Sequence, residues 1–355
     1  MKHALRTTCA VSAAIAVVFV IRPGTVWTAA RGAETRSMFS IRALPGNGGD
    51  FSEANGINNR GQIVGVSVDA SGVIQAVIWE RGSITNLATL GGGYSIAQAI
   101  NDRGQVTGYS TTTAGTLHAA LWDNGMITDL GTLGGDYSTA YDINQRGQIV
   151  GSATTSTGEQ HAVLWEEGTI IDLGTLPSEG FIPASIAWGI NDRRQVVGVS
   201  TAAGGTQHAF LWEDGVMLDL GVLAGGSFSS AIDINKRGDL VGVSNRAEGF
   251  GDTKAFLSQD GVMTDLPILS GTTDSIARAI NDRGEIVGDS GMPSGALHAV
   301  LWRGREVIDL TPLSTDSYSI AWDMNNKGDI VGRSTDESFR TTAVMWTRRG
   351  TSGKR

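Results

Sequence analysis

Short apolar runs alternate with polar turns along most of the chain. In the segment 94–133, a run over residues 95–100 is followed by the turn Asn101-Asp102-Arg103-Gly104, and further runs cover residues 105–110, 118–122 and 126–130. The turns are rich in Asn, Asp and Gly, which tolerate the backbone conformations of tight turns. This alternation predicts four short β-strands connected as a meander.

The same unit recurs seven times. Variants of the phrase Ile-Asn-Asp-Arg-Gly-Gln-Val place their first Asn at Asn58, Asn101, Asn144, Asn191, Asn235, Asn281 and Asn325, with spacings of 43, 43, 47, 44, 46 and 44 residues. Repeats of this length are typical of β-propellers and solenoids. The sequence therefore predicts an all-β fold, a seven-bladed β-propeller of four-stranded antiparallel blades.

The chain ends indicate how the blades are completed. The first run of every repeat carries an Ala at one position, which suits a crowded inner strand: Ala54, Ala97, Ala140, Ala187, Ala231, Ala277 and Ala321. The last repeat lacks a fourth run, whereas residues 38–44 form an alternating run ahead of the first repeat. We expect this N-terminal strand to pair into the last blade and close the ring, which removes two exposed sheet edges. An open stack of the same sheets is the alternative.

The first thirty residues have the pattern of a secretory signal. Lys2 and Arg6 precede an apolar run over residues 9–21, which is too short to span a bilayer, and Thr28 and Ala30 suit a signal-peptidase site. We expect a signal peptide over 1–30, a linker over 31–37, the propeller over 38–347 and a flexible tail over 348–355. The protein would be secreted, extracellular or periplasmic, and free of the membrane after cleavage; an uncleaved N-terminal anchor is the alternative.

Composition narrows the classes of partner and chemistry. The 355 residues carry a formal charge of -9, which argues against nucleic acid as a partner. The single cysteine, Cys9, lies in the predicted signal, so the mature chain would have no disulfide and no thiol ligand. We expect a monomer without a cofactor.

The third run of the repeats carries a family signature. Residues 208–212 read His-Ala-Phe-Leu-Trp, and His118, His161 and His298 open variants of this phrase. Over residues 38–347 the chain resembles the extracellular HAF-repeat proteins, and the resemblance implies export and a repeated β fold without implying a reaction. The chain departs from the pattern at Gln75, Lys254 and Thr342, which replace the His, and at Ser258, which replaces the Trp.

Residues that recur in every repeat are expected to serve the fold. The four His occupy equivalent positions on different blades, so they cannot converge on one metal ion, and each is expected to bond within its own blade. The recurring Trp are interpreted as packing residues, the recurring Ser as hydroxyls bonded to backbone, and the Asn-Asp-Arg-Gly segments as turns instead of calcium loops.

Residues that differ between repeats are the better candidates for function. The connector into the fourth repeat has four additional residues, and the fifth repeat has two additional residues in the loop after its second run. Trp188 and Trp322 occupy a variable inner-strand position, either lining the axis or packing between blades, and aromatic rings precede the first run of five repeats. We predict a shallow ligand site near the fourth and fifth repeats, with candidate residues Phe181, Trp188, Asp252, Lys254, Tyr137 and Tyr318. Neutral loop insertions are the alternative.

Together these patterns predict a secreted, non-catalytic binding or scaffolding protein. Its partner would be a carbohydrate or an exported envelope protein, and no catalytic residue is assigned. The alternative is a hydrolase or lyase of the propeller kind acting on an extracellular polymer. Such an enzyme requires acid and base side chains grouped on one face, whereas the non-repeated acids are scattered along the chain: Asp136, Glu179, Asp252, Asp274 and Asp316.

Overall fold

The computed structural model describes residues 38–246, 253–269, 274–292, 295–313 and 316–349. All of these lie in one compact unit, Ser37–Arg355. The predicted signal peptide and linker, the chain after residue 349, and the candidate residue Asp252 lie outside the described residues. In the described part of the chain, no helix is long and apolar enough to cross a membrane.

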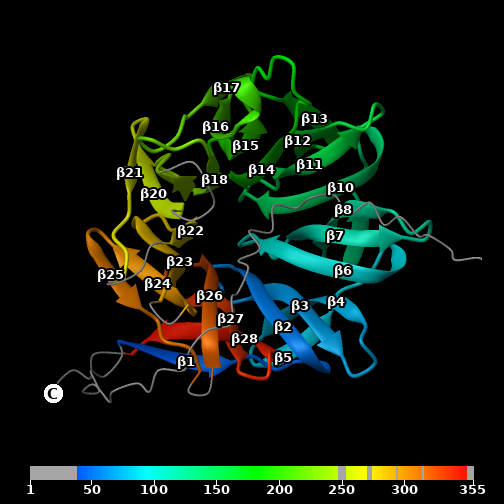
Figure 1. The fold of residues 1–355 in the computed structure, drawn as a ribbon. Coiled ribbons are helices and arrows are strands. Elements are labelled where there is room, and N and C mark those ends of the chain that lie inside the picture. Colours follow the sequence, from blue (N-terminus) through cyan, green and yellow to red (C-terminus); the bar gives the residue numbers. More distant parts are fainter. Residues whose placement is uncertain (1–37, 247–252, 270–273, 293–294, 314–315, 350–355) are drawn as a thin grey trace, which may run out of the picture. The chain divides into compact units, whose positions relative to one another are not determined.

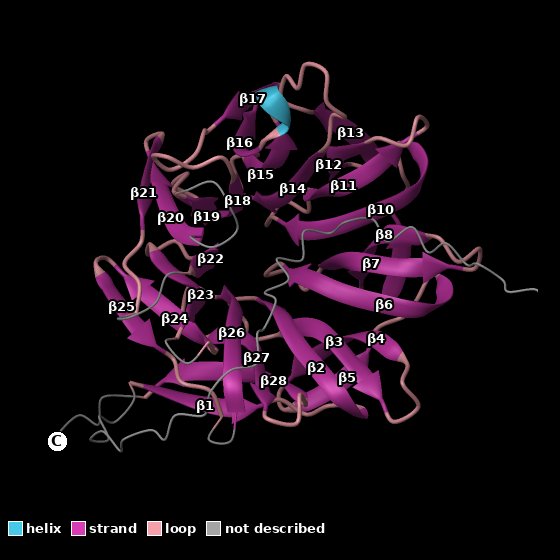
Figure 2. Ribbon diagram, in the orientation of Figure 1, coloured by secondary structure: helices cyan, strands magenta, loops and turns pink. Residues whose placement is uncertain are grey.

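Nearly all the regular structure is β-strand (Figure 2). Five sheets have four antiparallel strands each, in chain order: β6 (Gly91–Ile100), β7 (Val106–Thr112), β8 (Leu117–Asp123), β9 (Met126–Asp129); β10 (Gly134–Ile143), β11 (Ile149–Thr155), β12 (Gln160–Glu166), β13 (Thr169–Gly174); β14 (Ser185–Ile190), β15 (Val196–Thr201), β16 (Gln207–Glu213), β17 (Val216–Asp219); β18 (Ser229–Ile234), β19 (Leu240–Asn245), β20 (Thr253–Gln259), β21 (Val262–Asp265); and β22 (Ser275–Ile280), β23 (Glu285–Gly291), β24 (Leu297–Arg303), β25 (Glu306–Asp309). A short 3-10 turn, η1 (Ala203–Gly205), lies between β15 and β16.

The remaining strands form one eight-stranded sheet made of two four-stranded groups. One group is β2 (Gly48–Ile57), β3 (Ile63–Asp69), β4 (Ile74–Glu80) and β5 (Ser83–Asn86); the other is β26 (Asp316–Met324), β27 (Ile330–Asp336), β28 (Thr341–Arg348) and β1 (Phe39–Ala43). A single parallel bridge between Phe51 and Thr341 connects the two groups. The expected all-β architecture of four-stranded antiparallel meanders is confirmed. Below, repeats 1 to 7 begin at β2, β6, β10, β14, β18, β22 and β26.

The N-terminal strand pairs with the last strand of the chain, as the sequence predicted. β1 runs antiparallel to β28 with Ile41 opposite Trp346 and Ala43 opposite Val344. Phe39 is 3% exposed and belongs to a core cluster with residues of β24 and β28. β28 extends through Arg348, one residue beyond the expected end of the repeated region. Figure 1 shows the sheets following one another around a common centre, with the first strand of each repeat innermost.

Every innermost strand contains a bulge at the same place. The register with the second strand shifts directly after the recurring Ala in all seven repeats, as between Ala54 and Gly56 in β2. The recurring Ala are fully buried, and the residue opposite is always Gly. A Cβ added at Gly65 would lie 2.0 Å from the carbonyl oxygen of Glu53, so the bulge leaves no room for any side chain there.

The recurring Ser residues join neighbouring repeats, and the recurring His residues bond within one repeat. The Ser two residues before the recurring Ala of each inner strand accepts the backbone N–H of an Ala in the preceding repeat, as Ser95 Oγ does from Ala76 at 3.0 Å and Ser52 Oγ from Ala343 at 3.0 Å. Each of the four His bonds an Asp of its own repeat, as His118 does with Asp129 at 2.8 Å. Both interpretations made from the sequence are confirmed.

The recurring Asn has the largest set of bonds. Asn144 Oδ1 accepts the N–H groups of Arg146 and Gln148, and its Nδ2 donates to Gln148 Oε1 and to the carbonyl of Asn191 in the next repeat at 3.0 Å. The equivalent bond to the next repeat recurs at all seven Asn, and the last runs from Asn325 to the carbonyl of Asn58 at 3.2 Å. These residues are therefore turn-forming and cross-repeat residues.

The recurring Trp cover the sheet interfaces. Four of them donate their indole N–H to a carbonyl in the connector ahead of their repeat, as Trp79 does to Pro45 at 2.7 Å and Trp122 to Ala88 at 2.7 Å. Trp79 is 2% exposed and packs with residues of β2, β3 and β28. The packing interpretation of these rings is confirmed.

Replacing Phe39 by Ala should destabilise the protein by about 3–5 kcal/mol, because it empties a buried position where β1 pairs with the last strand of the chain. Chemical denaturation would measure the change. Met38→Ala is the matched control, since Met38 is half-exposed and should change stability by less than about 0.5 kcal/mol. Equal effects of the two substitutions would contradict a structural role for β1.

Candidate functional site

A central cavity opens at the end of the inner strands that carries the Asn turns. Its volume is about 320 Å³. The lining residues are the Ile or Met that ends each inner strand, recurring Asn residues, and the variable residues that follow them: Asn59, Asp102, Gln145, Asp192, Lys236, Asp282 and Asn326. The cavity thus has apolar groups at its base and polar groups at its mouth.

The variable residues at the mouth are mostly bonded to one another. The backbone N–H of each donates to the side chain of the next, as Gln145 does to Asp192 at 2.9 Å and Asn326 to Asn59 at 2.9 Å. Lys236 interrupts this chain because an ammonium group cannot accept a hydrogen bond; it pairs with Asp282 at 3.0 Å. Since these groups satisfy each other, the mouth of the cavity primarily ties adjacent repeats together.

Three Asp residues directly precede the Ile or Met that ends an inner strand and lines the cavity. The sequence analysis did not identify them as a group. Asp142, Asp233 and Asp323 occupy this position in repeats 3, 5 and 7, where the other repeats have Gly or Ala. Asp142 accepts the N–H groups of Ile143 at 2.7 Å and of Ile190 in the next repeat at 2.8 Å. The other two Asp repeat this pattern, so three carboxylates serve the N–H groups of six of the seven repeats.

The neighbours of these Asp residues are small for a steric reason. A Cβ added at Gly56 would lie 2.9 Å from the carbonyl oxygen of Gln98, and one at Gly189 would lie 2.9 Å from that of Ile232. The inner strands therefore approach closely at this level. The alternation of Asp with Gly or Ala along the chain was the sequence signal that could have revealed the arrangement.

The position of the three Asp strongly perturbs their ionisation. Burial raises the pKa of Asp142 to about 6, that of Asp233 to about 7 and that of Asp323 to about 8, and repulsion from the other acids adds to the shift. The two backbone N–H groups that each accepts oppose the shift but do not cancel it. The side chains lie deep in the protein and yet remain partly accessible from the axis, so protons can exchange there.

The bulge places a variable residue beside the axis in every repeat: Asn55, Gln98, Tyr141, Trp188, Ile232, Arg278 and Trp322. The contacts of these side chains cross from one repeat to the next. Asn55 Nδ2 donates to the carbonyl of Ala97 at 2.9 Å, the rings of Tyr141 and Trp188 are 4.4 Å apart, and the guanidinium of Arg278 lies 4.1 Å from the Trp322 ring. Trp188 and Trp322 thus pack between neighbouring inner strands.

Repeats 2 to 4 present four tyrosines and one tryptophan, which we call the tyrosine cluster: Tyr94, Tyr109, Tyr137, Tyr141 and Trp188. The rings of Tyr94 and Tyr109 stack with their centroids 6.2 Å apart, and the ring centroids of Tyr141 and Trp188 are 4.4 Å apart. Burial raises the pKa of all four Tyr, so each stays a neutral hydroxyl at physiological pH. All five side chains remain partly accessible.

Charged residues occupy the equivalent region of repeats 6, 7 and 1. Arg278 pairs with Asp289 at 2.5 Å, and Arg333 pairs with Glu53 at 2.7 Å. The Trp322 ring lies between the two guanidiniums, 4.1 Å from Arg278 and 6.0 Å from Arg333. The axis is therefore aromatic and neutral along one part of its circumference and ionic along another.

The structure distributes the predicted site residues over several locations. Trp188 and Tyr137 belong to the tyrosine cluster. Phe181 is half-exposed in the connector ahead of β14, where its ring lies against Gly205. Lys254 lies on β20 opposite Ser244, and Tyr318 lies near the start of β26. Sequence reasoning missed Tyr94, Tyr109 and Tyr141 as members of a group, although two of them sit at positions that it had already noted as variable or aromatic.

Among the described residues, no three His, Cys, Asp or Glu side chains lie close enough to hold a metal ion. The four repeated His are held by Asp residues of their own repeats, on different sheets.

The fold is similar to solved β-propellers. The β-propeller domain of the Trilobed protease from Pyrococcus furiosus matches with a TM-score of 0.56 and 9% identity over 83% of this chain and 95% of that chain. A puromycin hydrolase matches at 0.54 and 13%, over 84% of this chain and 52% of that chain, and a Mycobacterium tuberculosis puromycin-hydrolyzing peptidase at 0.50 and 13%, over 90% and 53%. At such low identities the likeness shows the β-propeller fold alone.

One topological difference stands out. The Pyrococcus domain has an open velcro topology, whereas β1 pairs with β28 in this chain. No family model matches the chain, and no curated protein matches it.

The raised pKa values of the axial Asp predict that stability falls as pH rises. Because the native state keeps protons that the unfolded chain, with a carboxyl pKa near 3.8, has already released, the extra stability is complete below about pH 4 and is lost as pH rises through about 6, 7 and 8. Urea denaturation across pH 4.5–9 would measure this loss.

Asp323→Asn should remove part of this loss, on the order of a few kcal/mol, while costing one hydrogen bond at every pH. Asp260→Asn, in an exposed turn, is the control and should keep the wild-type pH dependence. A wild-type stability that increases between pH 5 and 9 would show that burial does not govern these carboxyls.

Proposed function

We propose that this chain is an exported, monomeric, seven-bladed β-propeller that acts as a binding module without catalytic activity. The β1–β28 pairing and the Asn325–Asn58 hydrogen bond support a closed ring in which β1 is the fourth strand of the last blade. Export depends on the pattern of the first thirty residues, and the mass of the mature chain recovered from the host would test cleavage near Ala30.

The main support for a binding role is the variety of side chains at the bulge position of the inner strands. The recurring residues satisfy the backbone and the sheet interfaces, whereas this position holds seven side chains of six kinds, including two Trp, one Tyr and one Arg. Four recurring Trp donate their indole N–H groups to connector carbonyls, whereas the N–H groups of Trp188 and Trp322, like that of the recurring Trp165, have no hydrogen-bond partner among the described residues. The variety of side chains at the bulge position, set against the constancy of the recurring positions, therefore supports a role in binding.

The tyrosine cluster favours a carbohydrate as the ligand. Aromatic faces stack on the apolar faces of sugar rings, and phenolic hydroxyls both donate and accept hydrogen bonds with sugar hydroxyls. All four Tyr stay neutral at physiological pH, so the cluster offers a polar but uncharged surface. An exported protein that presents an aromatic side chain is the second kind of partner that this surface would accept.

A hydrolase or lyase role finds less support. The solved propellers with the higher similarity include peptidases, but the likeness extends only to the fold. In the described parts of the chain, the acids closest to the axis are committed to backbone N–H groups or to arginines. We therefore propose binding as the activity of this site.

A neutral-glycan microarray followed by titration of intrinsic fluorescence on the mature protein would test the proposal. Trp188→Phe should weaken binding by about tenfold, equivalent to about 1.4 kcal/mol, because it removes most of the stacking surface beside Tyr141. Trp212→Phe is the matched control: it alters a buried packing residue and should lower the melting temperature while leaving affinity within about twofold. Absence of any glycan binding, or unchanged affinity of Trp188→Phe, would refute the proposed site.

A further inference from the structure

The last residue of the Asn turn has an unusual set of partners in repeat 6. In repeats 1 to 3 this residue is a Gln whose amide bonds an acid at the end of the third strand, as Gln105 does with Asp123 at 3.1 Å. In repeat 6 it is Glu285, and the end of the third strand carries Arg303. The recurring amide–acid pair is thus replaced by an acid–arginine pair at this place.

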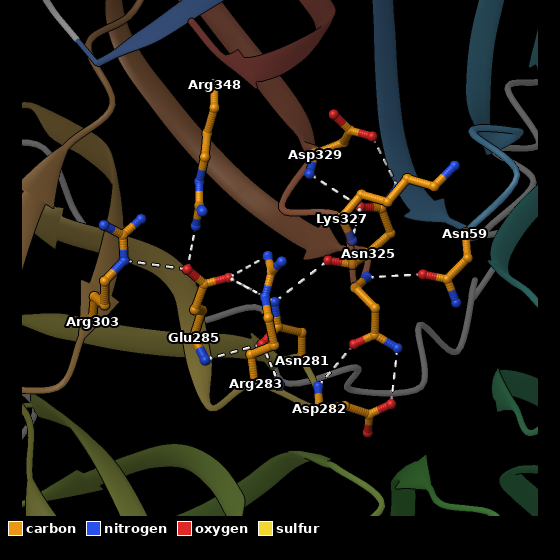
Figure 3. Close-up of polar contacts among 11 residues, drawn as sticks. Asn59, Asn281, Asp282, Arg283, Glu285, Arg303, Asn325, Lys327, Asp329 and Arg348 are labelled. Atoms are coloured by element: carbon orange, nitrogen blue, oxygen red, sulfur yellow. Dashed lines mark hydrogen bonds and ion pairs between the residues drawn. The ribbon is translucent and has the colours of Figure 1, made fainter. Parts of the chain in front are cut away.

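Three arginines surround this single carboxylate (Figure 3). Glu285 Oε2 accepts from Arg283 Nε at 3.0 Å and Nη2 at 2.6 Å, and Oε1 accepts from Arg303 Nε at 3.2 Å and from Arg348 Nη2. Asn281 donates to Oε2 as well. Burial alone would raise the pKa of Glu285, but hydrogen bonds from Asn281, Arg348 and Arg283 lower it to about 2, so the carboxylate is ionised at any physiological pH.

The cluster of three arginines and Glu285 carries a formal charge of +2. Three guanidiniums face one carboxylate, and the only ion pairs they make among the described residues are those with Glu285. The Glu285 side chain is 8% exposed, whereas those of Arg283, Arg303 and Arg348 are 44%, 41% and 38% exposed. The buried acid thus orients three donors whose remaining N–H groups face solvent.

A glycine keeps two of these guanidiniums close together. A Cβ added at Gly328 would lie 2.8 Å from Arg283 Nη2 and 3.3 Å from Arg348 Cζ. At the equivalent Gly147, Gly238 and Gly284 an added Cβ would meet the guanidinium of one arginine only. The extra arginine comes from β28, the strand that pairs with the N-terminal strand, so this arrangement arises only where the two ends of the chain meet.

We propose that Arg283, Arg303 and Arg348 form a site for a carboxylate or sulfate group of an acidic polysaccharide. Planar guanidiniums match the geometry of these oxyanions through paired N–H donors, and several converging arginines hold them more firmly than one. The whole protein has a charge of -9, which repels polyanions elsewhere and limits binding to this seam between repeats 6 and 7. The site uses none of the residues of the tyrosine cluster and stands independently of the neutral-sugar proposal.

Isothermal titration of the mature protein with a galacturonate tetrasaccharide and a sulfated heparin tetrasaccharide, with maltotetraose as the neutral counterpart, tests the site. At least one acidic tetrasaccharide should bind. An excess of maltotetraose should not displace it. Arg303→Gln and Arg348→Gln should each weaken binding by about fivefold or more, since each removes one of three cationic donors.

Arg60→Gln is the matched control, since Arg60 holds the position of Arg283 in repeat 1 and has no acid partner among the described residues. Its affinity should stay within about twofold of wild type, and Trp188→Phe should do the same. Unchanged affinity of Arg303→Gln and Arg348→Gln, or an equal loss in Arg60→Gln, would overturn the site. Tighter binding of an eight-nucleotide oligothymidylate than of either glycan would overturn the assignment to a polysaccharide.

Discussion

Neighbouring repeats are joined mainly by recurring side chains, because the sheets share little backbone pairing: a single parallel bridge connects β2 to β28. The Ser hydroxyl of an inner strand accepts the N–H of an Ala on the third strand of the preceding repeat. The Asn amide donates to the Asn carbonyl at the end of the following inner strand. The rest of the molecule depends on this exchange, because it holds the inner strands of successive repeats together.

Because the number of repeats is odd, the Asp residues that bridge pairs of repeats cannot serve all of them. Each axial Asp bridges two repeats, so Asp142, Asp233 and Asp323 serve three pairs, and repeat 2 remains without such an acceptor. Placing three carboxyls near one axis raises their pKa values, since burial and mutual repulsion both disfavour the charged form. The solution that satisfies the backbone therefore also links stability to pH.

The residues proposed for binding occupy different positions in the repeat from the residues that hold the repeats together. Because the recurring Ser and Asn carry the bonds between repeats, the bulge position and the ends of the third strands can vary without breaking that exchange. Aromatic hydroxyls gather at one part of the axis around Tyr141 and Trp188, while arginines gather where the chain ends meet. The two proposed sites differ in ligand charge for this reason: one is neutral and aromatic, the other cationic.

The sequence by itself determined the strands, the turns, the sevenfold repetition and the pairing of residues 38–44 with the last repeat, since these depend on local patterns and on counting strands. It also identified the recurring Ser as bonded to backbone, the His as bonded within their own repeats, the Trp as packing residues and the Asn as turn residues. That the Ser and Asn bond to a neighbouring repeat became visible only in the structure. Only the tertiary structure decided which variable residues meet, because the inner-strand bulge removes one residue from the pairing in each repeat and directs it toward a neighbour. Arg348 reaches Glu285 across 63 residues of chain for the same kind of reason: the contact depends on how separate sheets lie side by side, which no spacing in one repeat encodes.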